Sequence, residues 1–239
     1  KTFVGGACDV GSTTKTYLDN CSDITSNNFD GNNIWFGVRE HASAAICNGL
    51  ALANLKPYTS TFLSFADYMK PAIRMAALSH LPGIYLFSHD SIAVGEDGPT
   101  HQPIEQLAML RSIPNVRVIR PADERETYAA WKLALKSTKT PTALILSRQN
   151  LPLLENSSDE GVARGAYVVS YEKKRADLVL IATGSEVALA IEAQQKLLEK
   201  RIDVRVVAMP SWEVFAEQDL EYRKSVLLLH SDRRVSVTT

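Results

Sequence analysis

Apolar and polar positions along this chain follow a repeating pattern that is typical of alternating strands and helices. Short apolar runs end in polar loops, and longer segments follow in which apolar residues recur at every third or fourth position. The runs predicted as strands are 34–38, 58–62, 83–88, 116–120, 142–146, 167–171, 178–182, 203–209 and 225–229. The segments predicted as helices are 42–54, 65–78, 104–110, 124–135 and 186–201. This alternation predicts an α/β protein with mainly parallel sheets that carry helices on both faces.

A polar stretch divides this pattern into two parts. Residues 156–161, Asn-Ser-Ser-Asp-Glu-Gly, have the composition of a flexible connection. We therefore expect two α/β domains at 1–155 and 167–239, joined by a linker at 156–166. The chain begins without Met, and it stops where a further strand begins, at 235–239. We expect it to be a piece of a longer protein whose second domain is incomplete.

Composition narrows the class of protein. Of the 239 residues, 45% are hydrophobic and 22% are charged, which is enough for a packed core. The net charge is -1 without a long basic run, so we expect neither a nucleic acid nor an anionic membrane as partner. No apolar run approaches the ~18 residues of a membrane-spanning helix. Cys8, Cys21 and Cys47 fit neither a disulfide framework nor metal-ligand spacing, which favours a reduced, cytoplasmic protein.

Residues 95–105, Gly-Glu-Asp-Gly-Pro-Thr-His-Gln-Pro-Ile-Glu, form the loop with the densest chemistry. The loop lies between a predicted strand and a predicted helix, which in an α/β sheet is the edge where ligands bind. The titratable residues in and just before it are His89, Asp90, Glu96, Asp97 and His101. Spacing alone leaves two interpretations open, a solvated Gly/Pro turn and a functional site.

Two further features also have two interpretations each. Glu40 precedes the helix 42–54, whose composition predicts burial nearly all round. Its carboxyl group either complements the helix dipole or, if buried, keeps its proton and donates a hydrogen bond. Phe62, Phe65 and Tyr68 lie at a strand-to-helix passage, and such aromatic residues are more often part of a core than of a cofactor site.

Five motifs in this order resemble the transketolase family. They are Gly-Val-Arg-Glu-His at 37–41, Thr-Phe-Leu-Ser-Phe at 61–65, Ser-His-Asp-Ser-Ile at 88–92, the loop 95–105, and Leu-Ser-Arg-Gln-Asn at 146–150. The resemblance runs from about residue 5 to the end of the chain. It implies the thiamine diphosphate-binding fold, with the pyrimidine-binding domain followed by part of the transketolase C-terminal domain.

The resemblance also implies a cofactor and the residues that hold it. In transketolases a Glu at the position of Glu40 hydrogen-bonds the aminopyrimidine of thiamine diphosphate and activates the cofactor. Aromatic residues at the positions of Phe62, Phe65 and Tyr68 line the pyrimidine ring. These residues make up the pyrimidine half of the cofactor site only.

For the substrate, the resemblance implies contacts with a sugar phosphate. His89 and His101 are expected to contact its carbonyl and hydroxyl groups and to shuttle protons. Asp97 is expected to bind a sugar hydroxyl and Arg148 the sugar phosphate, since a planar guanidinium suits that anion. Thr13, in the small-residue loop 5–14, corresponds to a hydroxyl residue that touches the substrate phosphate.

The other half of the cofactor site has no counterpart in this sequence. The family binds the diphosphate and its Mg²⁺ or Ca²⁺ through Gly-Asp-Gly and a downstream Asn, whereas the nearest string here is Glu96-Asp97-Gly98. We therefore assign no metal ligand. The resemblance implies a homodimer in which a missing diphosphate-binding domain completes each site, so the chain alone is expected to be inactive.

Two kinds of alternative remain at this point. The chain could be a non-catalytic assembly module with a degenerate pocket, although the intact set of site residues favours an enzyme. Within the enzymes, 1-deoxyxylulose-5-phosphate synthase and the β chain of a 2-oxo acid dehydrogenase share a similar loop. The motifs at 88–92 and 147–150 favour transketolase, which transfers a two-carbon ketol unit between sugar phosphates in the pentose phosphate pathway.

Overall fold

The computed structural model describes residues 2–228 and 233–238 and divides the chain into two compact units. Unit 1 consists of Lys1–Arg117 and Ala134–Gln149, and unit 2 of Val118–Leu133 and Asn150–Thr239. The predicted α/β class with mainly parallel sheets is confirmed. The units are not contiguous in sequence, because Val118–Leu133 belongs to the second one; the domain limits at 155 and 167 stay a prediction.

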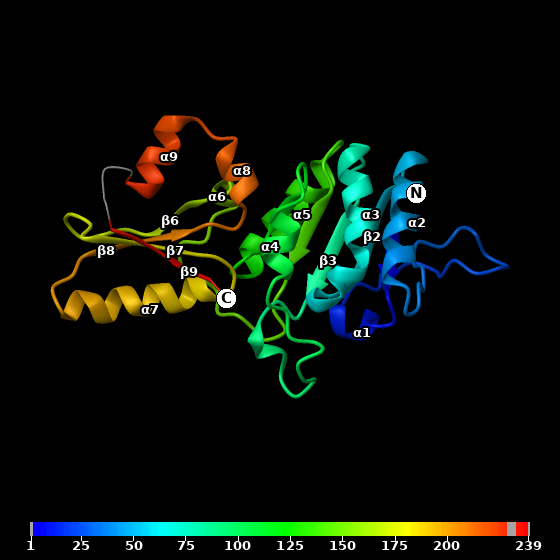
Figure 1. The fold of residues 1–239 in the computed structure, drawn as a ribbon, viewed down its shortest axis with the longest axis horizontal. Coiled ribbons are helices and arrows are strands. Elements are labelled where there is room, and N and C mark those ends of the chain that lie inside the picture. The colour runs from blue at the N-terminus through cyan, green and yellow to red at the C-terminus, as the bar shows by residue number, and fades with distance from the viewer. Residues whose placement is uncertain (1, 229–232, 239) are drawn as a thin grey trace. The chain divides into compact units, whose positions relative to one another are not determined.

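The first sheet has the strand order β1-β2-β3-β5-β4, and its strands β2 and β3 are labelled in Figure 1. Its strands are β1 (Phe3–Ala7), β2 (Lys56–Phe62), β3 (Ile84–Ser88), β4 (Arg117–Ile119) and β5 (Thr142–Ile145). The helical elements of this part of the chain are α1 (Gly11–Thr14), α2 (Glu40–Leu52), η1 (Leu63–Phe65), α3 (Ala66–Leu78), η2 (Ile92–Val94), α4 (Gln106–Arg111) and α5 (Glu124–Lys136). β2 runs parallel to both β1 and β3, and β3 runs parallel to β5.

The register of the central strands brings the carboxyl ends of β2 and β3 to the same edge of the sheet. Every residue of β3 is buried, as expected for an apolar strand covered on both faces. Phe62 pairs with Ser88, so β2 and β3 end at the same level. The chain leaves both strands there, toward α3 in one case and toward the loop 89–105 in the other.

The second sheet has the order β6-β8-β7-β9. Its strands are β6 (Tyr167–Ser170), β7 (Leu178–Ala182), β8 (Val204–Ala208) and β9 (Arg234–Val237). Its helices are α6 (Asp159–Ala163), α7 (Glu186–Glu199), α8 (Trp212–Ala216) and α9 (Leu220–Leu227). β7 is parallel to β8 and β9, whereas β6 is antiparallel to β8.

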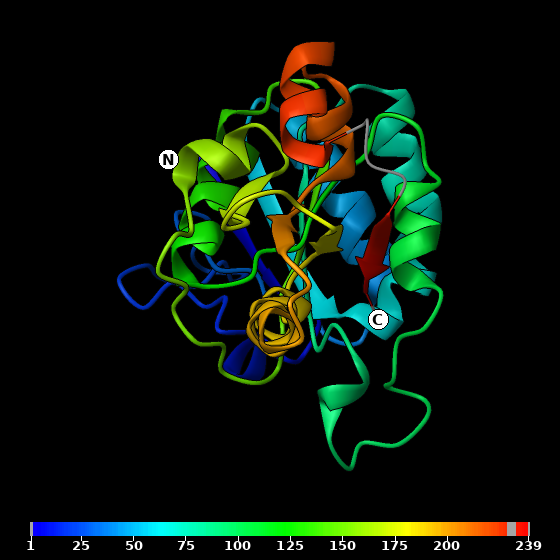
Figure 2. The same cartoon turned by 90° about the vertical axis from the view of Figure 1, so that its left-hand side faces the viewer.

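Alternate residues of the second sheet pack into two separate apolar clusters. Leu180 and Val206 belong to the cluster that includes Val187 of α7. Their neighbours Val179 and Val207 belong to the other cluster, with residues of α8 and α9. Figure 2, which looks along the axis of α7, shows that helix on one side of the strands and α8 and α9 on the other.

The predicted strand 34–38 is wrong. This segment runs beside β1 and hydrogen-bonds to it, from Ile34 N–H to Gly5 O at 2.8 Å and from Phe36 N–H to Ala7 O at 3.3 Å. Regular pairing ends there because Gly37 has φ +67, which interrupts the extended backbone. The apolar run therefore forms an irregular edge, and the isolated bridges beside it lie at Asn33, just before its start.

The predicted strand 225–229 is also wrong over the residues that the structure describes. Residues 225–227 complete α9, and residue 229 lies outside the described part of the chain. Asp219 caps the start of α9, since its carboxylate accepts the Tyr222 N–H at 2.7 Å. This cap favours a helix at 220–227. Periodicity alone does not distinguish a helix from a strand in such a short apolar run.

The segment 156–166, predicted as a linker, contains α6. Ser158 caps this helix by accepting the Gly161 N–H on its hydroxyl at 3.1 Å. The Tyr167 hydroxyl accepts the Ser158 N–H at 3.3 Å, so the segment is tied to the start of β6. It is an ordered part of unit 2.

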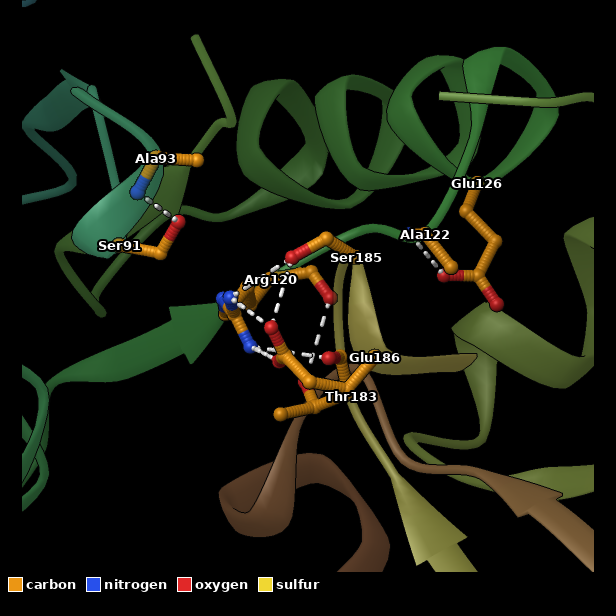
Figure 3. A network of polar contacts seen from close by, with 8 residues as sticks. All are labelled: Ser91, Ala93, Arg120, Ala122, Glu126, Thr183, Ser185 and Glu186. Atoms are coloured by element: carbon orange, nitrogen blue, oxygen red, sulfur yellow. Dashed lines mark hydrogen bonds and ion pairs between the residues drawn. The ribbon is translucent and has the colours of Figure 1, made fainter. Parts of the chain in front are cut away.

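A buried arginine holds Val118–Leu133 in unit 2. Arg120 is fully buried and donates to both carboxylate oxygens of Glu186, to Thr183 O at 2.9 Å and to Ser185 Oγ at 3.3 Å (Figure 3). Gly184 leaves room for the guanidinium, because a Cβ there would lie 2.7 Å from the Arg120 Cζ atom. The turn before α7 is thus closed by an ion pair.

Candidate functional site

The candidate site lies at the edge of the first sheet where β2 and β3 end. The ring of His89, which follows β3, stacks on the ring of Phe62, the last residue of β2, with the ring centroids 3.8 Å apart. The pairing of Phe62 with Ser88 explains this contact, because it brings the two strand ends together. Two predicted site residues that are distant in sequence are therefore adjacent in the structure.

Further rings extend this contact into an aromatic cluster, which consists of Phe62, Phe65, Tyr68, His89 and His101. Phe65 stacks at 6.4 Å from Phe62 and at 6.2 Å from Tyr68. His101 meets the rings of Phe62 and Phe65 edge-on, at 6.1 and 5.1 Å. Phe62 is 8% exposed and Tyr68 61%, so the cluster extends from the core to the surface.

His89 has an unusual backbone and a perturbed charge. It adopts φ +60, a left-handed conformation that is uncommon for residues other than glycine and is frequent at functional sites. Its Nδ1 atom lies 3.0 Å from the Ser88 hydroxyl. Burial lowers the pKa of His89, and the positive charge of Arg148 lowers it further, whereas Asp97 and Asp90 oppose the shift. The imidazole is therefore neutral near pH 7.

The loop 89–105 lies against Arg148. A Cβ on Gly95, where φ is +86, would stand 3.5 Å from the Arg148 Cζ atom, so the guanidinium lies over this glycine. Arg148 and Asp97 are both exposed, and each is close enough to His89 to influence its charge. His101 is half-buried, and its Nδ1 atom lies 2.9 Å from the exposed Thr100 hydroxyl.

Gln106 anchors the end of this loop, a role that sequence reasoning missed. Its side-chain oxygen accepts the Ile104 N–H at 2.8 Å, and its amide donates to the carboxylate of Asp67 in α3 at 3.1 and 3.2 Å. No sequence motif marks a glutamine that anchors a loop. The only available signal is the general rule that a buried polar side chain has hydrogen-bond partners.

Glu40 is the first residue of α2, and the start of this helix is held by a buried hydroxyl. Ser43 Oγ donates to Glu40 O at 2.9 Å and accepts from Thr59 Oγ1 and Cys8 Sγ, each at 3.1 Å. Thr59 belongs to β2, so α2 is fixed against the strand that ends at Phe62. Sequence reasoning also missed this contribution of Ser43.

The predicted burial of α2 nearly all round is wrong for this chain. Its buried residues are Ser43, Ala44, Cys47 and Ala51, which form one stripe. Ile46 is 46% exposed, Leu52 is 70% exposed, and Glu40 is half-buried. Because only one stripe packs on the unit's own elements, the opposite side of this apolar helix lies open.

Thr13 stands apart from the aromatic cluster in the described contacts. It is exposed in α1, and its N–H donates to Val10 O at 3.0 Å. Its neighbour Thr14 instead turns inward and joins Thr16 and Ser60 in a buried set of three hydroxyls. The structure thus joins Phe62, Phe65, Tyr68, His89 and His101 directly, and it leaves Thr13 without a contact to them.

Two buried hydroxyl groups beside the aromatic cluster lack partners. Thr61 is 1% exposed and Ser64 is 7% exposed, and the side-chain oxygen of each makes no hydrogen bond among the described residues. Buried polar groups are normally satisfied, so these two unpaired hydroxyl groups, on residues next to the aromatic residues in sequence, suit a ligand that carries polar groups as well as a flat ring. A substituted pyrimidine has these properties.

The described residues hold neither a metal-ligand cluster nor a membrane-spanning helix. No group of three or more His, Cys, Asp or Glu side chains is placed to hold a metal ion. None of the helices in that part of the chain is long and apolar enough to cross a membrane.

Comparisons with known proteins agree with the motifs. The family model "Transketolase, pyrimidine binding domain" matches residues 1–153, and "Transketolase-like TK C-terminal domain" matches residues 165–239. The chain is 54% identical to a transketolase of Bacillus subtilis over 98% of its own length and 53% identical to one of Halalkalibacterium halodurans over 93%. It covers only 36% and 34% of those relatives, so it spans about a third of their length.

Solved structures give the same assignment. A transketolase variant from Pichia stipitis superposes with a TM-score of 0.95 at 43% identity, over 99% of this chain and 36% of that one. For the transketolase of Leishmania mexicana the TM-score is 0.94 at 46% identity, with the same coverage of 99% and 36%. A split-gene transketolase described as an inactive β4 tetramer matches with a TM-score of 0.76 at 26% identity, over 99% of this chain and 73% of that one. The motifs, the fold and these relatives together show that the chain belongs to the transketolase family.

Proposed function

We propose that this chain provides the pyrimidine-binding half of a thiamine diphosphate site in a transketolase. The enzyme would transfer a two-carbon ketol unit from a ketose phosphate to an aldose phosphate, as in the pentose phosphate pathway. The observation that carries this proposal is the aromatic cluster at the ends of β2 and β3, where two histidines pack against three aromatic rings.

The residues present fit the pyrimidine half of the cofactor. The rings of Phe62, Phe65 and Tyr68 offer apolar surface to a flat heterocycle, and the unpaired hydroxyl groups of Thr61 and Ser64 offer hydrogen bonds. Glu40, half-buried at the start of α2, is proposed to hydrogen-bond the aminopyrimidine. When bound, thiamine diphosphate supplies the electron sink that ketol transfer requires and that no side chain provides.

The loop and the strand end supply the proposed contacts to a sugar phosphate. The exposed guanidinium of Arg148 suits the phosphate group, and Asp97 suits a sugar hydroxyl. His89 and His101 are proposed to contact the substrate's carbonyl and hydroxyl groups. Thr13 is proposed as a further phosphate contact, which rests on the motif alone.

The diphosphate and its divalent metal, Mg²⁺ or Ca²⁺, are proposed to be held outside this chain. The sequence contains no Gly-Asp-Gly, the segment that carries this role in the family. We propose that a diphosphate-binding domain completes the site in a cytoplasmic homodimer. The open side of α2, with Ile46 and Leu52 exposed, is apolar surface available for such an assembly.

Calorimetry tests the proposal. The chain is titrated with thiamine diphosphate and Mg²⁺, first alone and then mixed with the amino-terminal domain of the Bacillus subtilis relative. We expect weak binding by the chain alone, because most of the cofactor's charge lies on the diphosphate, and tight binding with ketol transfer after mixing. As a control, the same mixture is prepared with Phe62→Ala, which removes a ring of the aromatic cluster and should weaken cofactor binding.

Two results would contradict the proposal. Tight, Mg²⁺-dependent binding by the chain alone would place the diphosphate site within it. Formation of a stable mixed complex that neither binds the cofactor nor transfers a ketol unit would instead favour a non-catalytic assembly module.

A further inference from the structure

We infer that Ser88 fixes His89 as the neutral tautomer with its proton on Nε2, whereas the tautomer of His101 is left free. His89 is then a committed hydrogen-bond donor, and His101 is the histidine that can exchange a proton. The consequence for catalysis rests on the proposed function, but the assignment of the tautomer does not.

The direction of the hydrogen bond between Ser88 and His89 follows from burial. The two atoms, Ser88 Oγ and His89 Nδ1, are 3.0 Å apart, and the residues are 5% and 4% exposed. Among the described residues the Ser88 hydroxyl has no other hydrogen-bond partner. If Nδ1 carried the proton, the hydroxyl hydrogen would be buried without an acceptor, which is unfavourable. Ser88 therefore donates to Nδ1, and the proton of the neutral ring is on Nε2.

Two contacts hold the imidazole ring of His89 in this orientation. Its face packs on Phe62 at 3.8 Å, and its backbone is held at φ +60 directly after the paired residue Ser88. A half-turn flip of the imidazole about its Cβ–Cγ bond would keep the stacking contact but break the hydrogen bond, and any other large rotation would break the stacking contact as well. Ser88 thus acts as a positioning residue, as outer-shell partners commonly do for functional histidines.

His101 also has a hydroxyl group beside its Nδ1 atom, but its surroundings are more exposed to solvent than those of His89. His101 Nδ1 lies 2.9 Å from Thr100 Oγ1, but Thr100 is exposed and His101 is half-buried. Water can accept the Thr100 hydroxyl hydrogen, so the hydroxyl can either donate to Nδ1 or accept from it. Both tautomers of His101 are therefore satisfied, and the two histidines, which look equivalent in the sequence, differ in what they can do.

The charges around His89 support a neutral donor. The groups that act on it are Arg148 and His101, which disfavour protonation, and Asp97 and Asp90, which favour it. Burial is the largest influence and keeps the pKa of His89 below its ordinary value. A neutral ring with hydrogen on Nε2 donates to an oxygen atom, such as one that gains negative charge during ketol transfer, and it does not accept a proton there.

NMR of the 239-residue chain labelled with [¹⁵N]histidine tests the inference without cofactor or substrate. The ring nitrogen shifts of His89, assigned with the variant His89→Gln, report both tautomer and pKa. We expect the Nε2–H form in the unaltered chain. We expect Ser88→Ala to raise the pKa of His89 by roughly 0.4 to 1 unit, because the lost hydrogen bond stabilised only the neutral ring. Ser88→Thr should restore the original value.

Thr100→Ala is the matched control and should leave the shifts and the pKa of His89 unchanged. A proton on Nδ1 in the unaltered chain would overturn the inference, as would a pKa that stays the same or falls in a folded Ser88→Ala variant. If that variant does not fold, the tautomer of the unaltered chain still decides. Failure of this test leaves the calorimetric test of function unaffected, and the reverse also holds.

Discussion

Glu126 shows how strongly the interior of this protein can act on one residue. Its carboxyl group is fully buried, and it accepts hydrogen bonds from the Tyr167 hydroxyl and the Ala122 N–H, each at 2.7 Å (Figure 3 shows the second). Burial raises its pKa from 4.5 to about 7, although both hydrogen bonds favour the charged form. The folded chain therefore binds this proton more tightly than the unfolded chain does.

This difference predicts that stability falls as pH rises. Between the unfolded pKa near 4.5 and the folded pKa of about 7, the folded state holds more protons, so the free energy of unfolding decreases through this window. A shift of this size corresponds to a loss on the order of 3 kcal/mol. Glu126→Gln, which does not titrate, should largely remove the difference in urea midpoint between pH 5 and pH 8.

Tryptophan fluorescence measures this midpoint in unit 2. Trp131 and Trp212 both belong to that unit, and Trp35→Phe removes the tryptophan of unit 1. The exposed neighbour Glu124, changed to Gln, is the matched control and should keep the original pH dependence. An unchanged pH dependence in Glu126→Gln would show that this carboxyl group is not the cause.

Glu40 gives a prediction about catalysis. In the assembled enzyme, Glu40→Ala should reduce ketol transfer by roughly 10²–10⁴-fold, since the carboxyl group proposed to activate the cofactor is lost. The fold should remain, because Ser43 holds the helix start through the backbone oxygen of Glu40 and not through its side chain. Far-UV circular dichroism and exchange of the cofactor's C2 proton measure the two effects. Normal exchange in a folded variant would remove Glu40 from this role, and His41→Ala provides the adjacent exposed control.

Arg148 gives a prediction about substrate choice. Its exposed guanidinium is proposed to hold a phosphate group, so Arg148→Ala should weaken phosphorylated acceptors far more than unphosphorylated ones. A lost charge-assisted contact costs roughly 1.5–3 kcal/mol, or about ten- to a hundredfold in kcat/KM. Equal losses for ribose 5-phosphate and an unphosphorylated aldehyde would argue against a phosphate contact.

At the residue scale, the motifs predicted the members of the aromatic cluster but not what positions them. His89 and Phe62 could be named from the sequence because motif and strand order predict where they lie. Ser88 acts through one hydrogen bond, and Gln106 acts through bonds to Ile104 and Asp67. Such contacts depend on side-chain packing, which the spacing of residues in the sequence does not predict. The wrong prediction that α2 is buried nearly all round has a similar origin, since burial depends on which elements cover a helix.

Among the elements, the turn between β7 and α7 depends on one buried ion pair. Arg120 is fully buried and Glu186 is 6% exposed, so either charge alone would be costly. Glu186→Ala should destabilise unit 2 by roughly 3–5 kcal/mol, because it leaves the Arg120 charge without its main partner. Glu192, exposed on the same helix, is the matched position for a control substitution.

Urea unfolding of the Trp35→Phe background, followed by fluorescence, measures this effect. If Glu186→Ala and Glu192→Ala shift the midpoint equally, the ion pair contributes little. Combining Glu186→Ala with Arg120→Met removes both charges and should recover part of the lost stability, which separates the cost of an unpaired charge from that of a cavity.

Sequence patterns predicted the elements best where the chain is continuously buried. β3 and β8 coincide closely with their apolar runs, since a run covered on both faces has few alternatives to a strand. The segments 34–38 and 225–229 failed for local reasons. Gly37 interrupts the first segment, and the Asp219 cap favours a helix in the second. Both effects come from single residues, whereas hydrophobic periodicity is read over many residues at once.

At the scale of the whole molecule, the discontinuous unit 2 predicts which part of the chain folds alone. Residues 118–239 contain both Arg120 and Glu186, whereas residues 150–239 lack the partner of Glu186. We expect the longer polypeptide to unfold cooperatively in urea and the shorter one to remain unfolded. Dispersed amide NMR signals from 150–239 alone would contradict this expectation.

The sequence could not reveal this discontinuity. Composition pointed to a single boundary, the linker at 156–166, a segment that contains α6. Residues 118–133 have the ordinary pattern of a strand and a helix, and nothing in the pattern states which core they join. The assignment depends on contacts over more than sixty positions, such as that between Arg120 and Thr183, 63 residues apart.

The path of the chain also limits how such a gene can recombine. The backbone passes between the two units at 117/118, 133/134 and 149/150, so a single exchange between two parental genes at 149/150 separates Val118–Leu133 from the rest of its unit. The hybrid would then join the Arg120 of one parent to the Glu186 of the other. Unit 2 of the hybrid would keep this ion pair only where both parents carry it, so the two segments are expected to be inherited together although they lie far apart in the sequence.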